Sequence, residues 1–253
     1  LHNGLIVMFS GTPCQTAGLN SYIGKKNRDK LYLVDIACHG VPGPFLWRDY
    51  LHYIENKQKD VLTYVNFRDK QLFGWKAHRE SFLFRKTANV KKTFDFTFYK
   101  HIFFRKSCGN CHYTNLHRPS DLTLADFWYY ENNDSSLGFD NKGLSLVLSN
   151  TEKGQALLDI VRENFVIFQL VDVNKSMQQA LKEPFSAHPS RSRFERDYQA
   201  KGFVYAKKSF NFKSFTLLKF FNINLFPKIF PEFIFKIYFC VSFLLFGLVD
   251  EFL

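Results

Sequence analysis

Four of the five cysteines lie next to predicted loops, and their spacing is the feature of the sequence that most directly indicates chemistry. Cys108 and Cys111 form a Cys-x-x-Cys pair, whereas Cys14 and Cys38 each stand alone after a short apolar segment. No secretory signal precedes the first apolar segment, so we expect a cytoplasmic protein whose thiols stay reduced. In that setting a Cys-x-x-Cys pair indicates a metal, cluster or redox site, and two unliganded thiols are the alternative. Cys240 lies in an apolar stretch and is expected to be a small hydrophobic side chain.

The two isolated cysteines are placed by predicted strands of a parallel sheet. Leu5–Phe9 and Leu31–Ala37 are apolar, β-prone segments, and each is followed by a Pro-containing turn and a helix, the second near Phe45–Asn56. Continuous apolar strands that alternate with helices are typical of a parallel sheet covered on both faces. Because ligand sites form beyond the carboxyl ends of such strands, Cys14 and Cys38 should meet at one edge of the sheet.

Four thiols that converge from three loops would form a four-cysteine site. Zinc and a 4Fe-4S cluster both accept four thiolates. Structural zinc usually takes two close cysteine pairs, whereas this chain has one pair and two isolated positions, which favours iron–sulfur and leaves zinc as the alternative. His39 and His112 each follow one of these cysteines, and either could donate a hydrogen bond to a ligand sulfur or be an ordinary loop histidine.

The remaining periodicity completes an α/β fold with an insertion. Short strands separated by turn residues predict an antiparallel insertion over Val61–Arg68, Arg79–Lys86 and Val90–Phe96, and a short helix over 98–107 would deliver the Cys-x-x-Cys pair. Further strands are expected at Leu122–Phe127, Leu144–Ser149 and Val166–Val171, and helices at Thr151–Asn164, Asn174–Glu183 and Ser190–Lys201. The fold class is therefore α/β, with a partly parallel sheet flanked by helices and an antiparallel insertion.

Composition changes near residue 203, which divides the chain into a domain over 1–202 and a Phe- and Lys-rich tail over 203–253. Within this tail, Ile237–Val249 is an uncharged apolar run, shorter than the about 20 residues that a membrane-spanning helix needs. We expect an apolar helix here that makes peripheral contact with a membrane surface or a partner. A helix packed on its own domain is the alternative.

The net charge of the chain, although large, does not by itself indicate a class of partner. Lys and Arg number 34 against 23 Asp and Glu, a net charge of +11, and there are 31 Phe. A base-composition bias of the source genome explains the many Phe and Lys as well as a function does. The basic residues are scattered along the sequence, so we do not expect a nucleic-acid partner. No nucleophile elbow or His-x-x-x-His spacing is present, and no catalytic residue is assigned.

Five motifs, in order along residues 5–200, are similar to those of a known family. They are Gly11-Thr-Pro-Cys14-Gln15, Cys38-His-Gly-Val-Pro42, Phe67-Arg68-Asp-Lys70 with Gly74-Trp75, Cys108-x-x-Cys111 with Arg118-Pro-Ser-Asp121 and Asp126-Phe-Trp128, and Lys142-Gly143-Leu-Ser145. Together they resemble the coenzyme F420 hydrogenase/dehydrogenase beta-subunit family. The chain departs from the family at Tyr129 and Tyr130, where a glycine usually follows the tryptophan. It also lacks a preceding ferredoxin-like segment and so looks N-terminally truncated.

This resemblance implies an iron–sulfur flavoprotein oxidoreductase subunit. A 4Fe-4S cluster would be held by Cys14, Cys38, Cys108 and Cys111. FAD would exchange hydride with a small-molecule carrier, either the deazaflavin coenzyme F420 or another two-electron partner, and single electrons with iron–sulfur centres. The expected protein partner is a redox subunit or a ferredoxin-like segment. The alternatives are a zinc-stabilised, non-redox binding module and a truncated relative that has lost its flavin.

The candidate cofactor-binding residues come from two loops and three basic side chains. They are Gly11, Thr12, Pro13, Gln15, Arg68, Lys70, Arg118, Lys142, Gly143 and Ser145. The first loop leads into a helix N-terminus, whose N–H groups suit a flavin phosphate, although a plain strand–helix turn explains it equally well. The second loop is equally consistent with a hairpin turn. The basic side chains would neutralise an anionic cofactor, unless they form a solvated surface. Asp121 and Asp126 are expected to have structural roles.

Overall fold

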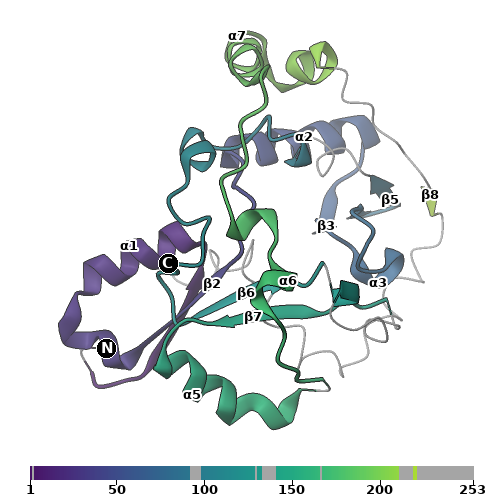
Figure 1. Ribbon diagram of the computed structural model, residues 1–253. Coiled ribbons are helices and arrows are strands. Elements are labelled where there is room, and N and C mark those ends of the chain that lie inside the picture. Colours follow the sequence, from purple (N-terminus) through teal and green to yellow (C-terminus); the bar gives the residue numbers. More distant parts are fainter. Residues whose placement is uncertain are drawn as a thin grey trace.

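The fold is built around a four-stranded mixed sheet. The computed structural model describes residues 1, 3–91, 98–128, 130–132, 141–165, 167–210 and 219–220. The strands are β1 (Val7–Gly11), β2 (Leu31–Ile36), β6 (Leu122–Asp126) and β7 (Ser145–Ser149), in the spatial order β1-β2-β6-β7. The first three run parallel and β7 is antiparallel to β6. Figure 1 shows α1 (Pro13–Ile23) above this sheet and α5 (Glu152–Val161) below it, so the predicted α/β architecture is confirmed.

Local signals in the sequence account for the two helices that cover this sheet. Pro13 begins α1, and the side-chain oxygen of Gln15 accepts a hydrogen bond from the Thr12 backbone N–H at 2.9 Å. Thr151 caps α5 by accepting a hydrogen bond from the Gly154 N–H at 3.1 Å. The 3-10 helix η1 (Lys25–Lys30) follows α1, and the 3-10 helix η4 (Arg162–Asn164) follows α5. Leu158 of α5 is buried against the strands, which fixes this helix on its face.

The long connection between β2 and β6 forms a second layer, which confirms the predicted antiparallel insertion. It contains α2 (Pro44–Gln58), β3 (Leu62–Asn66), α3 (Lys70–Phe73), β4 (Glu80–Phe84) and β5 (Ala88–Lys91). The second sheet has the order β3-β4-β5-β8, with antiparallel pairing throughout and β8 (Lys219–Phe220) at its edge. The strand expected over Val90–Phe96 begins earlier, and residues 92–97 lie outside the described residues.

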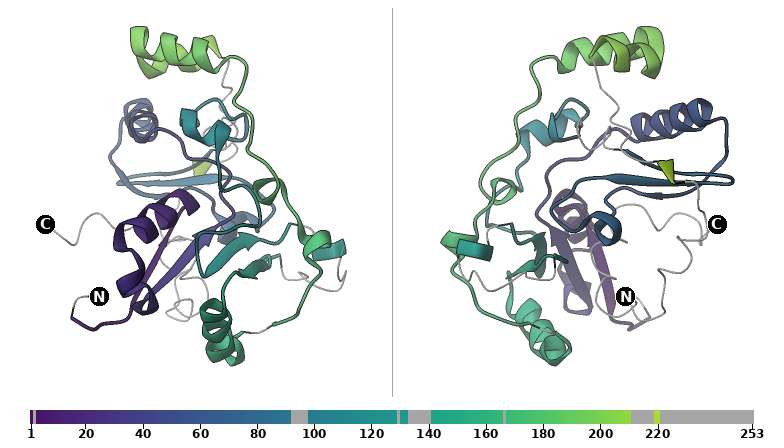
Figure 2. Two further views of the ribbon diagram at one scale, coloured as in Figure 1. Left: turned by 60° about the vertical axis from the view of Figure 1, so that its left-hand side comes forward. Right: turned by 90° about the vertical axis from the view of Figure 1, so that its right-hand side faces the viewer.

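Helix α7 (Arg191–Ser209) packs on this second layer. The helix expected over Ser190–Lys201 was predicted to end there, and α7 is interrupted at the next residue, Gly202, which has a φ of 75°. The helical path resumes at once, and Phe203 and Ala206 are buried in the same core cluster as Tyr50 of α2 and Phe82 of β4. Figure 2 shows α7 at one end of the molecule and α5 at the other. The predicted domain limit after residue 202 coincides with this break in α7.

Three local predictions were wrong. The strand expected at Val166–Val171 is absent over the described residues 167–171, where Leu170 is 90% exposed and no neighbouring strand pairs with the segment. The helix over Asn174–Glu183 is broken into α6 (Val173–Ser176) and η5 (Gln179–Leu181). Of the short helix expected over 98–107, residues 98–99 are helical and 106–107 begin a 3-10 helix that contains Cys108. Residues 100–105 instead form turns and a bridge between Pro42 and Phe104. Apolar periodicity cannot detect such long-range pairing.

The remaining short elements are η2 (Lys106–Asn110) and η3 (Tyr130–Asn132). The tail helix expected at 237–249 lies outside the described residues. Among the helices that the structure describes, none combines the length and the apolar character needed to span a membrane.

Candidate redox site

The sheet and its insertion bring the four predicted cysteines to one edge. Cys14 lies in the first turn of α1, directly after β1, and Cys38 follows the end of β2. The parallel register pairs Gly11 of β1 with Asp35 of β2, so the two strands end at the same level. Cys108 lies in η2 and Cys111 directly follows it. All four are free thiols.

Burial and the neighbouring cysteines both raise the pKa of the Cys38 thiol. Burial is the largest cause that raises the pKa of the Cys38 thiol to about 12, and a hydrogen bond with the Gly40 backbone opposes it. Cys108, Cys14 and Cys111 each raise this pKa further through Coulombic repulsion. Because this repulsion weakens with distance, its presence indicates that the other three cysteines lie in the region of Cys38. A bound cation would reverse its sign and favour the thiolates.

Backbone groups hold two of the cysteine loops together. The Val41 N–H donates a hydrogen bond to the sulfur of Cys108 at 3.4 Å, and the Cys108 N–H donates to the Arg105 carbonyl at 3.0 Å. Gly40 has a φ of 136°, and a Cβ placed there would lie 2.5 Å from the ring of Phe104. Only glycine therefore allows this loop to approach Phe104 so closely.

The hydroxyl of Thr12 lies near the third loop's sulfur, with 3.1 Å between Thr12 Oγ1 and Cys14 Sγ. Hydrogen bonds to sulfur are the interactions that tune a thiolate-ligated metal or cluster. The donor set thus fits a cluster of soft thiolate ligands. The described part of the chain nevertheless contains no group of three or more His, Cys, Asp or Glu side chains that could hold a single metal ion.

The side chain of His39, the residue after Cys38, packs among aromatic rings. Its ring stacks on Phe185 with a centroid distance of 3.8 Å, and its Nε2 lies 2.9 Å from Nε2 of His101. Nδ1 of His101 lies 3.3 Å from the carbonyl oxygen of Ser186, which can only accept, so this nitrogen carries the proton. Nε2 of His101 then accepts, and His39 donates from Nε2.

The charge state of His39 agrees with this hydrogen-bond pattern. Burial is the largest cause that lowers the pKa of His39 to about 4, and the neighbouring His101 and His78 contribute to this lowering. The ring is therefore neutral at neutral pH. Because His39 Nε2 donates its proton to His101, it does not donate to a cysteine sulfur. His101 is a site residue that the sequence analysis missed. His101 has no motif signal, although its positive φ of 57° marks it in the structure.

A second group of predicted residues gathers at the end of β6. Arg68 and Lys70 both pair with the carboxylate of Asp126, and Lys70 Nζ lies 3.2 Å from its Oδ1. Burial raises the pKa of Asp126, but the charges of Arg68 and Lys70 outweigh it and hold this pKa below its ordinary value. The Arg68 guanidinium also lies 5.0 Å from the ring centroid of Trp128. We call Arg68, Lys70, Asp126 and Trp128 the basic–aromatic cluster.

The predicted Lys142-Gly143 loop supports this cluster from behind. Trp75 stacks on Trp128 with ring centroids 4.6 Å apart, and its backbone N–H donates to the Asn141 carbonyl. Gly143 has a φ of 82°, and a Cβ there would lie 2.6 Å from the Trp75 ring. The side chains of Lys142 and Ser145 are exposed. The loop therefore positions the indoles of Trp75 and Trp128. Both tryptophans belong to the motifs that carry the family resemblance, but the sequence analysis did not assign them to the site.

Arg118 lies elsewhere, inside the protein. Its side chain and that of Asp35 are both 0% exposed, and Arg118 Nη2 donates to Asp35 Oδ1 at 2.8 Å. The other guanidinium nitrogens donate to Thr123 and to the carbonyls of Tyr113 and Asn115, and Nη2 also reaches Ile36. This arrangement leaves no donor for a cofactor phosphate, so Arg118 braces the sheet. Asp121 is likewise structural, since it binds Arg28.

The first predicted phosphate loop is partly satisfied by its own side chains. Gly11 and Pro13 are buried, and Gln15 Oε1 accepts hydrogen bonds from both the N–H and the hydroxyl of Thr12. Cys14 and Gln15 are exposed on the first turn of α1. The N–H groups of that turn face the cysteine edge of the sheet, where a helix N-terminus favours anionic groups such as thiolates or phosphates.

Comparison with known proteins identifies a family whose sequence model matches this chain. Residues 6–172 match the sequence model of a family described as the C terminus of the beta subunit of coenzyme F420 hydrogenase/dehydrogenase. This stretch contains all four cysteines and the basic–aromatic cluster, and it ends before α7. A search of curated proteins found no match.

Proposed function

The chain belongs to the coenzyme F420 hydrogenase/dehydrogenase beta-subunit family, as its motifs predict, and on that premise we propose that it is the iron–sulfur flavoprotein subunit of a redox complex. In this proposal Cys14, Cys38, Cys108 and Cys111 hold one 4Fe-4S cluster. FAD lies near the basic–aromatic cluster and supplies hydride exchange with a deazaflavin or another two-electron carrier.

The observation that carries the proposal is geometric: Cys14 and Cys38 follow the ends of two paired parallel strands, and the Val41 N–H in the Cys38 loop donates to the Cys108 sulfur at 3.4 Å. The support for iron–sulfur over zinc is the donor set itself, which has one close cysteine pair and two isolated cysteines. Structural zinc usually takes two close pairs, whereas a 4Fe-4S cluster also accepts four thiolates.

The residues of the chain then have distinct tasks. The Val41 N–H and the Thr12 hydroxyl lie next to ligand sulfurs, where they stabilise negative charge. The neutral His39 ring, stacked on Phe185, adds an uncharged aromatic group next to the loop of Cys38. Arg68 and Lys70 provide positive charge at the end of β6 for an anionic cofactor, and Asp126 holds them there.

The first test is anaerobic purification, followed by measurement of iron, sulfide, zinc and flavin on one sample. About four irons and four sulfides per chain are expected, the content of one 4Fe-4S cluster. Cys108→Ser should lower the iron content, while Cys240→Ser, in the tail, serves as the matched control. One zinc without flavin would replace this proposal by a structural four-cysteine site. Equal iron content in both variants would remove the ligand assignment.

A further inference from the structure

A pocket outside the proposed redox site lies between α2, residues 102–105 and α7. Its floor is apolar and is formed by Leu46, Ile102, Phe103 and Phe194, with Phe45 at the mouth, 63% exposed. The pocket is built from both the family-matched region and α7, which lies beyond residue 172. Neither the cysteine site nor the basic–aromatic cluster contributes a side chain to it.

The size of the pocket restricts what it can hold. Its volume is about 240 Å³. Cofactor and substrate sites are usually larger, about 300–1,000 Å³. The pocket therefore suits one aromatic side chain rather than a whole cofactor. Aromatic side chains inserted into such pockets are the usual anchors of protein–protein interfaces.

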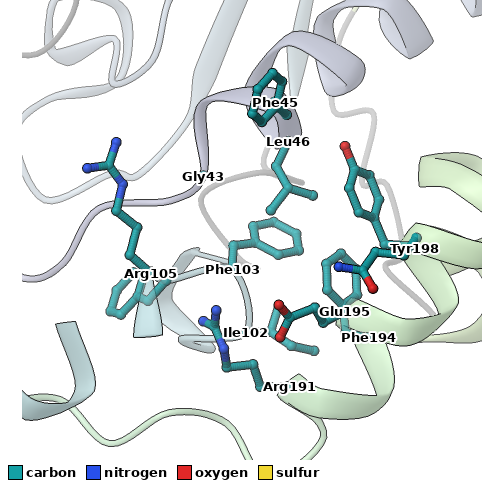
Figure 3. Close-up of a pocket in the computed structure, with 12 residues that line it drawn as sticks. Gly43, Phe45, Leu46, Ile102, Phe103, Arg105, Arg191, Phe194, Glu195 and Tyr198 are labelled. Atoms are coloured by element: carbon teal, nitrogen blue, oxygen red, sulfur yellow. The ribbon is translucent and has the colours of Figure 1, made fainter. Parts of the chain in front are cut away.

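The charges around the pocket select an anionic occupant. Arg105, Arg191 and Glu195 line it, and Glu195 is paired with Lys106 at 3.5 Å. Nη1 of Arg191 is buried and has no hydrogen-bond partner among the described residues. Figure 3 shows the Arg191 guanidinium turned inward, toward the side of the pocket where Phe103 lies, and that of Arg105 turned outward. A carboxylate that enters the pocket would meet the two guanidinium groups that line it, and guanidinium binds carboxylates through charge-assisted hydrogen bonds.

The wall of the pocket is continuous with the loop of Cys108. The Arg105 N–H donates to the Val41 carbonyl, the Arg105 carbonyl accepts from the Cys108 N–H, and the Val41 N–H donates to the Cys108 sulfur. Phe104 forms a bridge with Pro42 across the same turn. An occupant of the pocket therefore contacts the segment that directly supports a proposed cluster ligand.

We infer that this pocket is the docking site of a partner polypeptide that inserts an aromatic side chain flanked by carboxylates, with the aromatic ring on Phe103 and Phe194 and one carboxylate on Arg191. The further carboxylates of such a segment meet Arg105 and Arg48, which lies 5.1 Å over the Phe45 ring at the rim. That the partner is a redox protein rests on the proposed function, since its docking places it beside the Cys108 loop.

The test uses the full-length chain, labelled with ¹⁵N, and two probes. The first probe is 3-phenylpropanoate, which carries one aromatic ring and one carboxylate, and the second is the capped peptide acetyl-Asp-Phe-Asp-amide. We expect both to shift the amide signals of Phe103 and Phe194, the first with a dissociation constant on the order of millimolar and the peptide with a lower one. 3-Phenylpropanol, which lacks the carboxylate, should bind more weakly.

Variants separate a specific pocket from general attraction to a basic protein. Arg191→Gln should weaken the binding of 3-phenylpropanoate about tenfold, in the range expected for a lost charge-assisted hydrogen bond. Arg193→Gln is the matched control, because this side chain lies on the same helix, is 61% exposed and does not line the pocket. Equal loss in both variants, or no shift with either probe, would overturn the inference.

Two further outcomes keep this inference distinct from the proposed function. If 3-phenylpropanoate binds and the peptide does not, the pocket takes a small molecule and the partner assignment is wrong. Iron and flavin are measured on the same samples. A chain without iron that still binds the peptide would refute the redox function and leave the docking site. A chain that contains iron but does not bind the peptide would refute the docking site and leave the redox function.

Discussion

Replacing Arg118 by methionine should destabilise the chain strongly without acting on the cofactor site directly. The substitution removes the guanidinium from an ion pair in which both side chains are 0% exposed, and it leaves the carboxylate of Asp35 buried. One oxygen of that carboxylate, Oδ2, already has no hydrogen-bond partner among the described residues. The variant would also remove the hydrogen bond that Arg118 donates to the other oxygen, Oδ1.

The size of the effect follows from what remains behind. Removing one partner of a buried ion pair costs about 3–5 kcal/mol, because an uncompensated charge stays in the interior. Carbonyl groups of Tyr113 and Ile36 also lose their donor, and each buried unsatisfied group costs about 1–3 kcal/mol when no water replaces it. We therefore expect a loss of at least about 3 kcal/mol, a large part of the about 5–15 kcal/mol that stabilises an ordinary domain.

Urea unfolding, followed by tryptophan fluorescence and circular dichroism, measures this loss. The double variant Asp35→Leu with Arg118→Met removes both charges and should recover most of the stability, since apolar replacements of buried pairs are often neutral. Arg193→Met, at an exposed position, should change stability by less than about 0.5 kcal/mol. A loss below about 1 kcal/mol for Arg118→Met, combined with a loss of flavin, would refute the structural role and return Arg118 to the cofactor.

Three further predictions test other parts of the fold. Gly143→Ala should cost about 2–4 kcal/mol in urea unfolding, because φ is positive and the new Cβ would overlap an indole, whereas Gly18→Ala, in open space on α1, should stabilise by about 0.5–1 kcal/mol. Asp126 has a lowered pKa in the folded chain, so its contribution to stability is complete above the ordinary carboxyl pKa and is lost as the pH falls through the lower folded value. The stability difference between the wild type and Asp126→Asn should therefore shrink as the pH falls below the ordinary carboxyl range, and a difference that grows on acidification would contradict this. Tyr50→Phe removes a donor to the buried carboxylate of Glu80 and should cost about 1–3 kcal/mol, and a melting temperature equal to that of the wild type would show that the hydrogen bond contributes nothing.

Local sequence was sufficient wherever an element depends on its own residues. The apolar segments at Leu5–Phe9 and Leu31–Ala37 correspond to β1 and β2, and Thr151 caps α5 as its side chain predicts. The positions of Cys14 and Cys38 follow from a geometric rule, since the ends of parallel strands meet at one edge. In the same way, the glycine that breaks α7 could be predicted, because Gly202 adopts a φ that few other residues tolerate.

Contacts between distant segments decided the rest. The side chain of Arg118 suits a phosphate as well as a buried carboxylate, and only the fold brings it to Asp35, on a strand far away in the chain. His39 could have donated to sulfur, but the turn at His101 supplies another acceptor. The segment at Val166–Val171 has the composition of a strand, and its described residues have no partner strand to pair with. Side-chain chemistry and short-range backbone preference are properties of the local sequence, whereas the partner of a charge, a ring or a strand depends on packing across the whole chain.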